Sequence, residues 1–138
     1  MRGVMIGLLT SRPMHQSRLA GFIIDCRTQD LEGAARFWSA ALGLPLAGAP
    51  GDDPGYRHLS GAPGGLHVEV QQVSHDSRVH LDIESDDLDA EATRLETLGA
   101  RRVTTLARWI VMEAPTGQRF CIVRPQSPDF PRHAHRWD

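Results

Sequence analysis

Apolar and polar positions follow two different periods along the chain. Apolar residues recur at steps of three and four within 31–42 and within 88–98, which predicts two amphipathic helices. An aspartate precedes each segment and a glycine follows each, as expected for helix caps: Asp30 and Gly43 for the first helix, Asp87 and Gly99 for the second.

Short β-rich segments surround both predicted helices, and Gly, Pro and Asp clusters that favour turns separate them. One strand precedes each helix and three follow it. The predicted strands are 19–26, 44–47, 56–59 and 66–73 around the first helix, and 78–84, 101–105, 109–113 and 119–123 around the second.

The order strand, helix, three strands therefore occurs twice. Asp30 and Asp87 lie 57 positions apart, and Gly43 and Gly99 lie 56 apart, so the two halves repeat almost in step. We expect one domain over 18–125, made of a first module at about 19–73 and a second at about 78–124. Residues 1–17 are expected to be an extension that is disordered or precedes the true start, and 126–138 an irregular C-terminal arm.

Composition excludes several classes of protein. The chain has 138 residues, 41% hydrophobic and 23% charged, with a formal net charge of −2, which is typical of a globular domain. A nucleic-acid binder would need an excess of basic residues. No apolar run approaches the roughly 18 residues of a membrane span. Two cysteines, Cys26 and Cys121, are too few for a disulfide framework, which favours reduced thiols and a cytoplasmic location.

Four segments in this order resemble the vicinal oxygen chelate superfamily, and within it the glyoxalase-like domain proteins. They are 22–26 (FIIDC), 34–43 (AARFWSAALG), 79–83 (VHLDI) and 115–125 (PTGQRFCIVRP). The resemblance implies an α+β fold in which two βαβββ modules form an eight-stranded, mostly antiparallel curved sheet around a cleft, with the helices outside. It also implies a homodimer, for which the strand at Trp109 or the Pro-rich tail offers a contact.

Members of this superfamily act as metal-dependent lyases and isomerases, cleave aromatic rings, epimerise substrates or sequester antibiotics. The resemblance thus implies a small-molecule ligand and leaves two functions open: a lyase or isomerase, and a non-catalytic binding protein of the bleomycin-resistance kind. Because the fold hosts both, only the site can separate them.

A divalent metal ion in the cleft is the cofactor that the resemblance implies. Its ligands come from the first and last strand of each module, which here are Gly21, Glu69, His80 and Cys121, with Gln71 replacing Glu69 if the register shifts by two. Glycine offers no side-chain donor, so only His80 and Glu69 are usual ligand types. The set is incomplete, and the same two residues are the candidate acid and base.

Strand alternation provides an independent test, because successive side chains face opposite sides of a sheet. Apolar residues such as Ile24, Val68 and Leu81 should pack on the helices. The opposite face collects the candidate cleft residues: Asp25, His67, Glu69, Gln71, His80, Asp82, Glu84 and, in the family register, Cys121. Such a polar face is either simply hydrated or the site of acid–base and ligand-binding chemistry.

Overall fold

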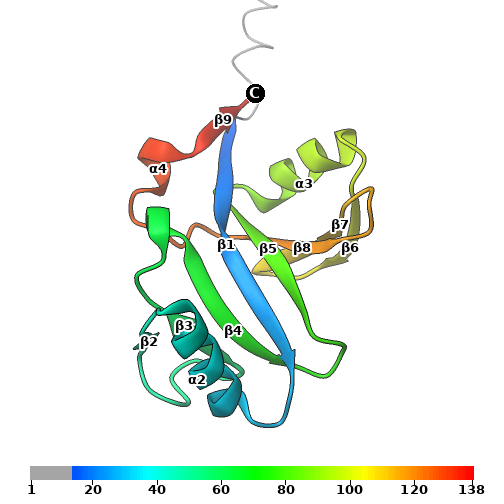
Figure 1. Cartoon of the computed structure of the whole chain (residues 1–138). Helices are drawn as coiled ribbons and strands as arrows, with labels where there is room; N and C mark the ends of the chain where they lie inside the picture. The colour runs from blue at the N-terminus through cyan, green and yellow to red at the C-terminus, as the bar shows by residue number, and fades with distance from the viewer. Residues whose placement is uncertain (1–13) are drawn as a thin grey trace, which may run out of the picture.

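The computed structural model describes residues 14–138 (Figure 1). Its helices are α2 (Leu31–Leu42), α3 (Leu88–Thr97) and the short α4 (Phe130–His133), with a 3₁₀ turn at Pro63–Gly65. Its strands are β1 (His15–Arg27), β2 (Leu46–Ala47), β3 (Tyr56–Leu59), β4 (His67–Val73), β5 (Arg78–Ser85), β6 (Arg101–Thr105), β7 (Trp109–Glu113), β8 (Arg119–Val123) and β9 (His135–Trp137).

The predicted caps delimit the two long helices. The Asp30 carboxylate accepts a hydrogen bond from the backbone N–H of Gly33 at 2.9 Å, and the Asp87 carboxylate accepts one from Ala90 at 3.0 Å. Gly43 ends α2 in the left-handed conformation, with φ of 70°, which a residue with a side chain rarely adopts. The helix signals in the sequence are therefore confirmed.

All strands form one sheet, and the two modules repeat the same pairing. The path through the sheet is β2-β3-β4-β1-β5-β8-β7-β6, with β9 paired to β1 off this path. β1 pairs parallel with β4, and β5 pairs parallel with β8. The antiparallel pair β1–β5 joins the modules, and the remaining pairs are antiparallel. The predicted α+β fold of two βαβββ modules is confirmed, with β9 as an additional ninth strand.

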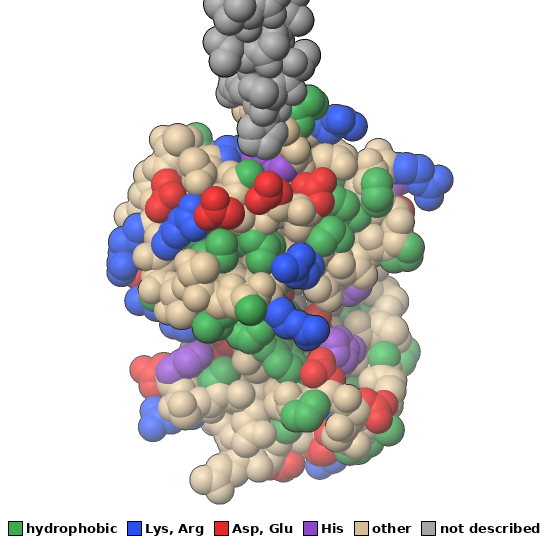
Figure 2. Space-filling model, turned by 180° about the vertical axis from the view of Figure 1, so that it is seen from behind, with side chains coloured by type: hydrophobic (Ala, Val, Ile, Leu, Met, Phe, Trp, Pro, Cys, Tyr) green, Lys and Arg blue, Asp and Glu red, His purple; other side chains and the backbone are tan. Residues whose placement is uncertain are grey.

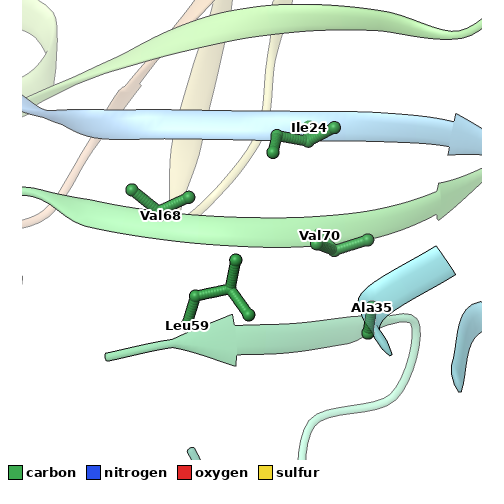
Figure 3. Packing of buried hydrophobic residues seen from close by; sticks show 5 residues of the cluster. All are labelled: Ile24, Ala35, Leu59, Val68 and Val70. Carbon is green, nitrogen blue, oxygen red and sulfur yellow. The ribbon is translucent and has the colours of Figure 1, made fainter. Parts of the chain in front are cut away.

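Each of the two long helices, α2 and α3, packs over the sheet of its own module (Figure 1). Beneath α2, Ala35 contacts a cluster formed by Ile24, Leu59, Val68 and Val70 (Figure 3). Beneath α3 lies the corresponding cluster of Ala92, Leu95, Ile110, Met112 and Ile122. These residues define the helix-covered face of the sheet, and they supply most of its apolar burial.

Both ends of the domain depart from the sequence-based expectation. The predicted extension through residue 17 is wrong for its last residues, because β1 begins at His15 rather than at Leu19; residues 1–13 lie outside the described part. In the tail, expected to be irregular, β9 pairs antiparallel with the start of β1, His15 opposite Trp137. The Trp137 indole N–H donates to the Ser17 hydroxyl at 2.8 Å. The early start of β1 and the strand β9 therefore stabilise each other.

The expectation that all apolar strand residues pack on the helices is wrong for β5. Val79 is 59% exposed and Leu81 is 44% exposed, whereas Ile83 packs beneath α3. α2 lies over β2, β3 and β4, and α3 lies over β6, β7, β8 and the start of β1, where Glu91 contacts Ser17. The part of β5 that carries Val79 and Leu81 remains uncovered on this face. Within residues 14–138, no helix combines the length and hydropathy needed to cross a membrane.

A substitution at Gly21 tests how closely β1 and β4 approach each other. A Cβ atom at this position would lie 1.8 Å from the backbone carbonyl oxygen of His67, its partner in the register. Gly21→Ala must separate the strands, so we expect it to lower the free energy of unfolding by about 1–3 kcal/mol or more, measured by urea titration. Gln72→Ala, at an exposed position of the same strand pair, should stay within about 0.5 kcal/mol of the parent. Equal stability of Gly21→Ala and the parent would contradict the register.

Candidate functional site

A cavity of about 520 Å³ opens on the face of the sheet opposite the helices. Residues of β1, β4, β5 and β8 form its floor, and β7 forms part of its wall. Figure 2 shows the molecule from behind the view of Figure 1; arginine, acidic, histidine and hydrophobic side chains lie next to one another across the middle of this face. We call this the cavity face of the sheet.

Six of the candidate cleft residues from the sequence line this cavity together: Asp25, Glu69, Gln71, His80, Asp82 and Cys121. Their strands and alternation account for this, since each lies on the face opposite the apolar residues that contact the helices. His67 and Glu84 do not line it.

The start of the C-terminal tail occupies the end of the cavity face where His67 and Glu84 lie. His67 is 3.0 Å from the Ser127 hydroxyl through its Nε2. Glu84 is fully buried. Its carboxylate accepts one hydrogen bond from Arg18 at 2.8 Å and another from the backbone N–H of Gln126. Both side chains therefore anchor the tail, and alternation alone did not reveal that this end of the face is covered.

His80 lies at the centre of the site and is held from both modules. Its Nδ1 donates to Asp25 Oδ2 of β1 at 2.8 Å, and its Nε2 lies 3.4 Å from Asp82 Oδ1 of its own strand. Cys121 of β8 pairs with Asp82 in the sheet register. Asp25 is only 2% exposed, and its second oxygen, Oδ1, has no hydrogen-bond partner within the part of the chain that the structure describes.

These contacts determine the charge of the His80 ring. Burial alone lowers the pKa of His80, but its interactions with Asp25, Asp82 and Cys121 more than reverse this and raise the pKa to about 11. The ring is therefore protonated, and so carries a positive charge, at neutral pH. Arg78 contributes further positive charge at 3.6 Å from Asp25 Oδ2.

Glu69 projects from β4 into the same cavity. Its side chain is 13% exposed, and its Oε2 lies 3.6 Å from Nδ1 of His58. The other ring nitrogen of His58, Nε2, lies 2.9 Å from Asp53 Oδ2. Burial raises the pKa of Glu69, and the nearby Asp82 adds to this, although His58 acts in the opposite direction. Tyr56, also on the cavity wall, has its pKa raised to about 12, chiefly by burial and then by Glu69.

Sequence reasoning missed several residues of the cavity wall. Tyr56 precedes His58 by two positions on β3, and Arg119 precedes Cys121 by two positions on β8, so each shares the cavity face with a polar neighbour. The alternation rule, extended from the longer strands to these short ones, identifies both. Trp109 and Val111 on β7 follow from the same rule.

The metal-ligand positions implied by the family resemblance do not all converge. Gly21 faces the His67 backbone, so no side chain fits there. Within residues 14–138, the grouping of His, Cys, Asp or Glu donors that could hold an ion is His80, Asp82 and Cys121, whose donor atoms lie within 4.8 Å of one another. Glu69 is not part of it. The residues present thus fit a cation through a different donor set, with nitrogen, oxygen and sulfur atoms.

The sequence pattern of the family described as "Glyoxalase-like domain" matches residues 21–123, about three quarters of the chain. The chain belongs to this family. The resemblance to the vicinal oxygen chelate superfamily seen in the sequence is therefore confirmed.

Solved structures show the same fold. A hypothetical protein from Bacillus halodurans C-125 is 13% identical with a TM-score of 0.57, over 80% of this chain and 96% of that one. Methylmalonyl-CoA epimerase from Mycobacterium tuberculosis is 20% identical with a TM-score of 0.57, over 83% of this chain and 91% of that one. No curated protein is significantly similar in sequence.

The raised pKa of Glu69 predicts a stability cost. A carboxyl whose folded pKa exceeds its unfolded pKa destabilises the native state at pH values above both, and the cost vanishes at pH values below both. We therefore expect Glu69→Gln to raise the melting temperature at about pH 8 by roughly 2–4 °C, which corresponds to about 1 kcal/mol. The gain should disappear near pH 4, close to the ordinary glutamate value. Thermal unfolding followed by circular dichroism measures both.

Glu113 provides the control of opposite sign. Hydrogen bonds from Arg119 and Arg101 lower the pKa of Glu113, so Glu113→Gln should lower the melting temperature at about pH 8 and lose that effect in acid. A Glu69→Gln protein that is less stable than the parent at about pH 8 would contradict the assignment of Glu69 as a carboxyl held in an unfavourable environment.

Proposed function

We propose that this protein is a small-molecule enzyme of the isomerase or lyase kind, acting in the cavity between its two modules. Glu69 transfers a proton at a carbon next to a carbonyl group, and the cationic centre at His80 stabilises the negative charge that develops on the carbonyl oxygen. One observation supports this proposal: Glu69, whose pKa is raised, and His80, a cation held by the Asp25 carboxylate, line the same cavity.

The sheet register supports these separate roles for Glu69 and His80. Ile23 of β1 pairs with Glu69 on one side and with His80 on the other, so both residues lie in one row across three strands. Two strand spacings separate their Cα atoms by about 10 Å. A small molecule fits between their side chains, with its carbon toward Glu69 and its oxygen toward His80.

Glu69 suits proton transfer because of its environment. A base works best when its pKa approaches the working pH, and burial raises the pKa of Glu69 in that direction. His80 suits charge stabilisation, because Asp25 fixes the ring through Nδ1 and directs Nε2 toward the cavity residues Asp82 and Cys121. Such preorganised positive charge in a partly buried site lowers the energy of a developing oxyanion.

Non-catalytic binding of a hydrophobic or aromatic molecule is the second candidate. Trp109, Val111 and Val123 give the cavity an apolar side on β7 and β8. Most small-molecule sites combine such a surface with a few polar groups, and this wall suits the non-reacting part of a ligand in either function. The two candidates differ in whether Glu69 does chemistry.

Solvent hydrogen exchange distinguishes them. The full-length protein is incubated in D₂O with a panel of small aldehydes, hydroxyketones, oxo acids and thioesters, and mass spectrometry measures deuterium at the carbon next to the carbonyl. We expect exchange for at least one compound, and a loss of about 10²–10⁴-fold in Glu69→Gln. Glu96→Gln, on the exposed surface of α3, should retain the parent rate. Binding of panel compounds with no exchange by the parent protein would favour sequestration and overturn the enzymatic proposal.

The expected homodimer, cytoplasmic location and lack of nucleic-acid partners remain predictions. Cys26 and Cys121 are both free, which supports a reducing compartment. They also lie on opposite faces of the sheet, since Cys26 packs toward α2 and Cys121 lines the cavity. Sedimentation equilibrium measures the oligomeric state, and a monomer at all concentrations would contradict the expected homodimer.

A further inference from the structure

We propose that Arg119 binds a carboxylate group of the substrate, and that the substrate is a 2-oxo carboxylic acid with a hydrogen on the carbon next to its carbonyl group. This inference deepens the proposed function and rests on it for the roles of Glu69 and His80. The carboxylate subsite itself rests on the position, the contacts and the charge of Arg119.

Arg119 extends the row of side chains that contains Glu69 and His80. In the parallel β5–β8 ladder Asp82 lies beside Cys121. Two residues earlier on both strands, the same register aligns His80 with Arg119. The row across the cavity face therefore runs from Glu69 on β4 through β1 and His80 on β5 to Arg119 on β8. One strand spacing, about 5 Å, separates the Cα atoms of the last two residues.

The contacts of Arg119 leave much of its guanidinium group for a ligand. Its Nε donates to Oε1 of Glu113 at 2.9 Å, and within residues 14–138 its side chain makes no other hydrogen bond. Both terminal amino groups are therefore available on the cavity wall. Two parallel N–H donors of this kind match the two oxygens of a carboxylate, which is the usual partner of an arginine fork.

The charges around Glu113 also favour an anion at this end of the row. Arg101 of the edge strand β6 contacts the same carboxylate, with its Nη2 3.1 Å from Oε1. Two guanidinium groups thus share one carboxylate, which leaves one positive charge in excess. Because Arg119 lines the cavity and Arg101 does not, a ligand in the cavity meets this excess charge at Arg119.

The order of the groups along the row selects the substrate class. A 2-oxo acid carries its reacting hydrogen, its carbonyl oxygen and its carboxylate on three consecutive carbon atoms, which matches the order Glu69, His80, Arg119. An acid of the malonyl type carries the carboxylate on the reacting carbon, where the Glu69 carboxylate would repel it. A neutral aldehyde or ketone has no group that uses the fork of Arg119.

The same order matches the charges of the proposed reaction. The Glu69 carboxylate takes the proton from the reacting carbon, and the electron pair of the broken C–H bond forms an enolate with its oxygen at His80. Return of a proton, or of a deuteron from the solvent, to that carbon restores the 2-oxo acid. The enolate carries two negative charges, and the row places one cation beside each, Arg119 at the carboxylate and His80 at the oxygen.

A pair of non-reacting ligands tests the subsite without chemistry. Trimethylpyruvate is a 2-oxo acid with no hydrogen on the carbon next to its carbonyl group, and its methyl ester lacks the negative charge. In an NMR titration of the full-length protein, we expect the acid to bind about 10–100-fold more tightly than the ester, as for a charged hydrogen-bonded pair. Equal affinities, or no binding of the acid, would overturn the carboxylate subsite.

The two arginines on Glu113 provide matched variants, because each substitution removes one guanidinium group from the same carboxylate. Arg119→Gln should lose the preference for the acid, and Arg119→Lys should keep part of it, since lysine retains the charge without the fork. Arg101→Gln should keep the parent preference. Circular dichroism of each variant confirms that it is folded. An equal loss in Arg101→Gln and Arg119→Gln would show that Arg119 only stabilises Glu113, which contradicts the subsite.

Deuterium exchange tests the substrate class. With 2-oxobutanoate, Arg119→Gln should raise KM about 10–100-fold and change kcat little, because the carboxylate contact is present both before and during proton transfer. Glu69→Gln should instead lower kcat. With methyl 2-oxobutanoate, Arg119→Gln should match the parent protein. A parent protein that exchanges the ester as efficiently as the acid would overturn the assignment of a 2-oxo acid.

Failure of the subsite and failure of the proposed enzyme give different results. Binding of trimethylpyruvate that depends on Arg119, with no deuterium exchange of any compound by the parent protein, overturns the enzymatic proposal alone. Deuterium exchange that depends on Glu69, together with equal binding of trimethylpyruvate and its ester, overturns the carboxylate subsite alone.

Discussion

The antiparallel pairing of β1 with β5 is the constraint on which the molecule depends. β1 pairs with β4 on one side and β5 pairs with β8 on the other, so among the described strands only this pair joins the two modules into one sheet. Its register sets Ile23 opposite His80, which places the Asp25 carboxylate 2.8 Å from the His80 ring. A slip by one residue would turn every side chain of β5 to the other face and dismantle both the site and the packing of Ile83.

The two faces of this sheet have opposite energetic roles. The helix-covered face provides the stability, through the apolar clusters around Ala35 and Ala92. The cavity face carries Asp25, a buried carboxylate whose Oδ1 has no hydrogen-bond partner among residues 14–138, and Glu69, whose raised pKa reduces stability at neutral pH. Groups that destabilise the folded protein are typical of functional sites. Their presence on the cavity face links the fold to the proposed chemistry.

Local signals in the sequence were sufficient for most of the fold and for the face of the sheet that carries the site. Caps at Asp30 and Asp87 delimited the helices, and alternation assigned His80 and Asp82 to the cavity. Alternation could not predict how far the site extends along the strands, because that depends on where the tail crosses the sheet and covers Glu84. The β9 pairing and the uncovered Val79 and Leu81 likewise follow from long-range packing, which no local pattern encodes.

In the proposed reaction Glu69 and His80, which come from different modules, act on the same bound molecule. A double-mutant cycle on the deuterium-exchange rate tests it, using Glu69→Gln, His80→Gln and the double variant with the compound that the parent protein exchanges fastest. We expect strong non-additivity, with the double variant no slower than the slower single variant within about twofold, because residues that act as a unit lose their effect together. Two independent losses that multiply in the double variant, or an unchanged rate in His80→Gln, would contradict it.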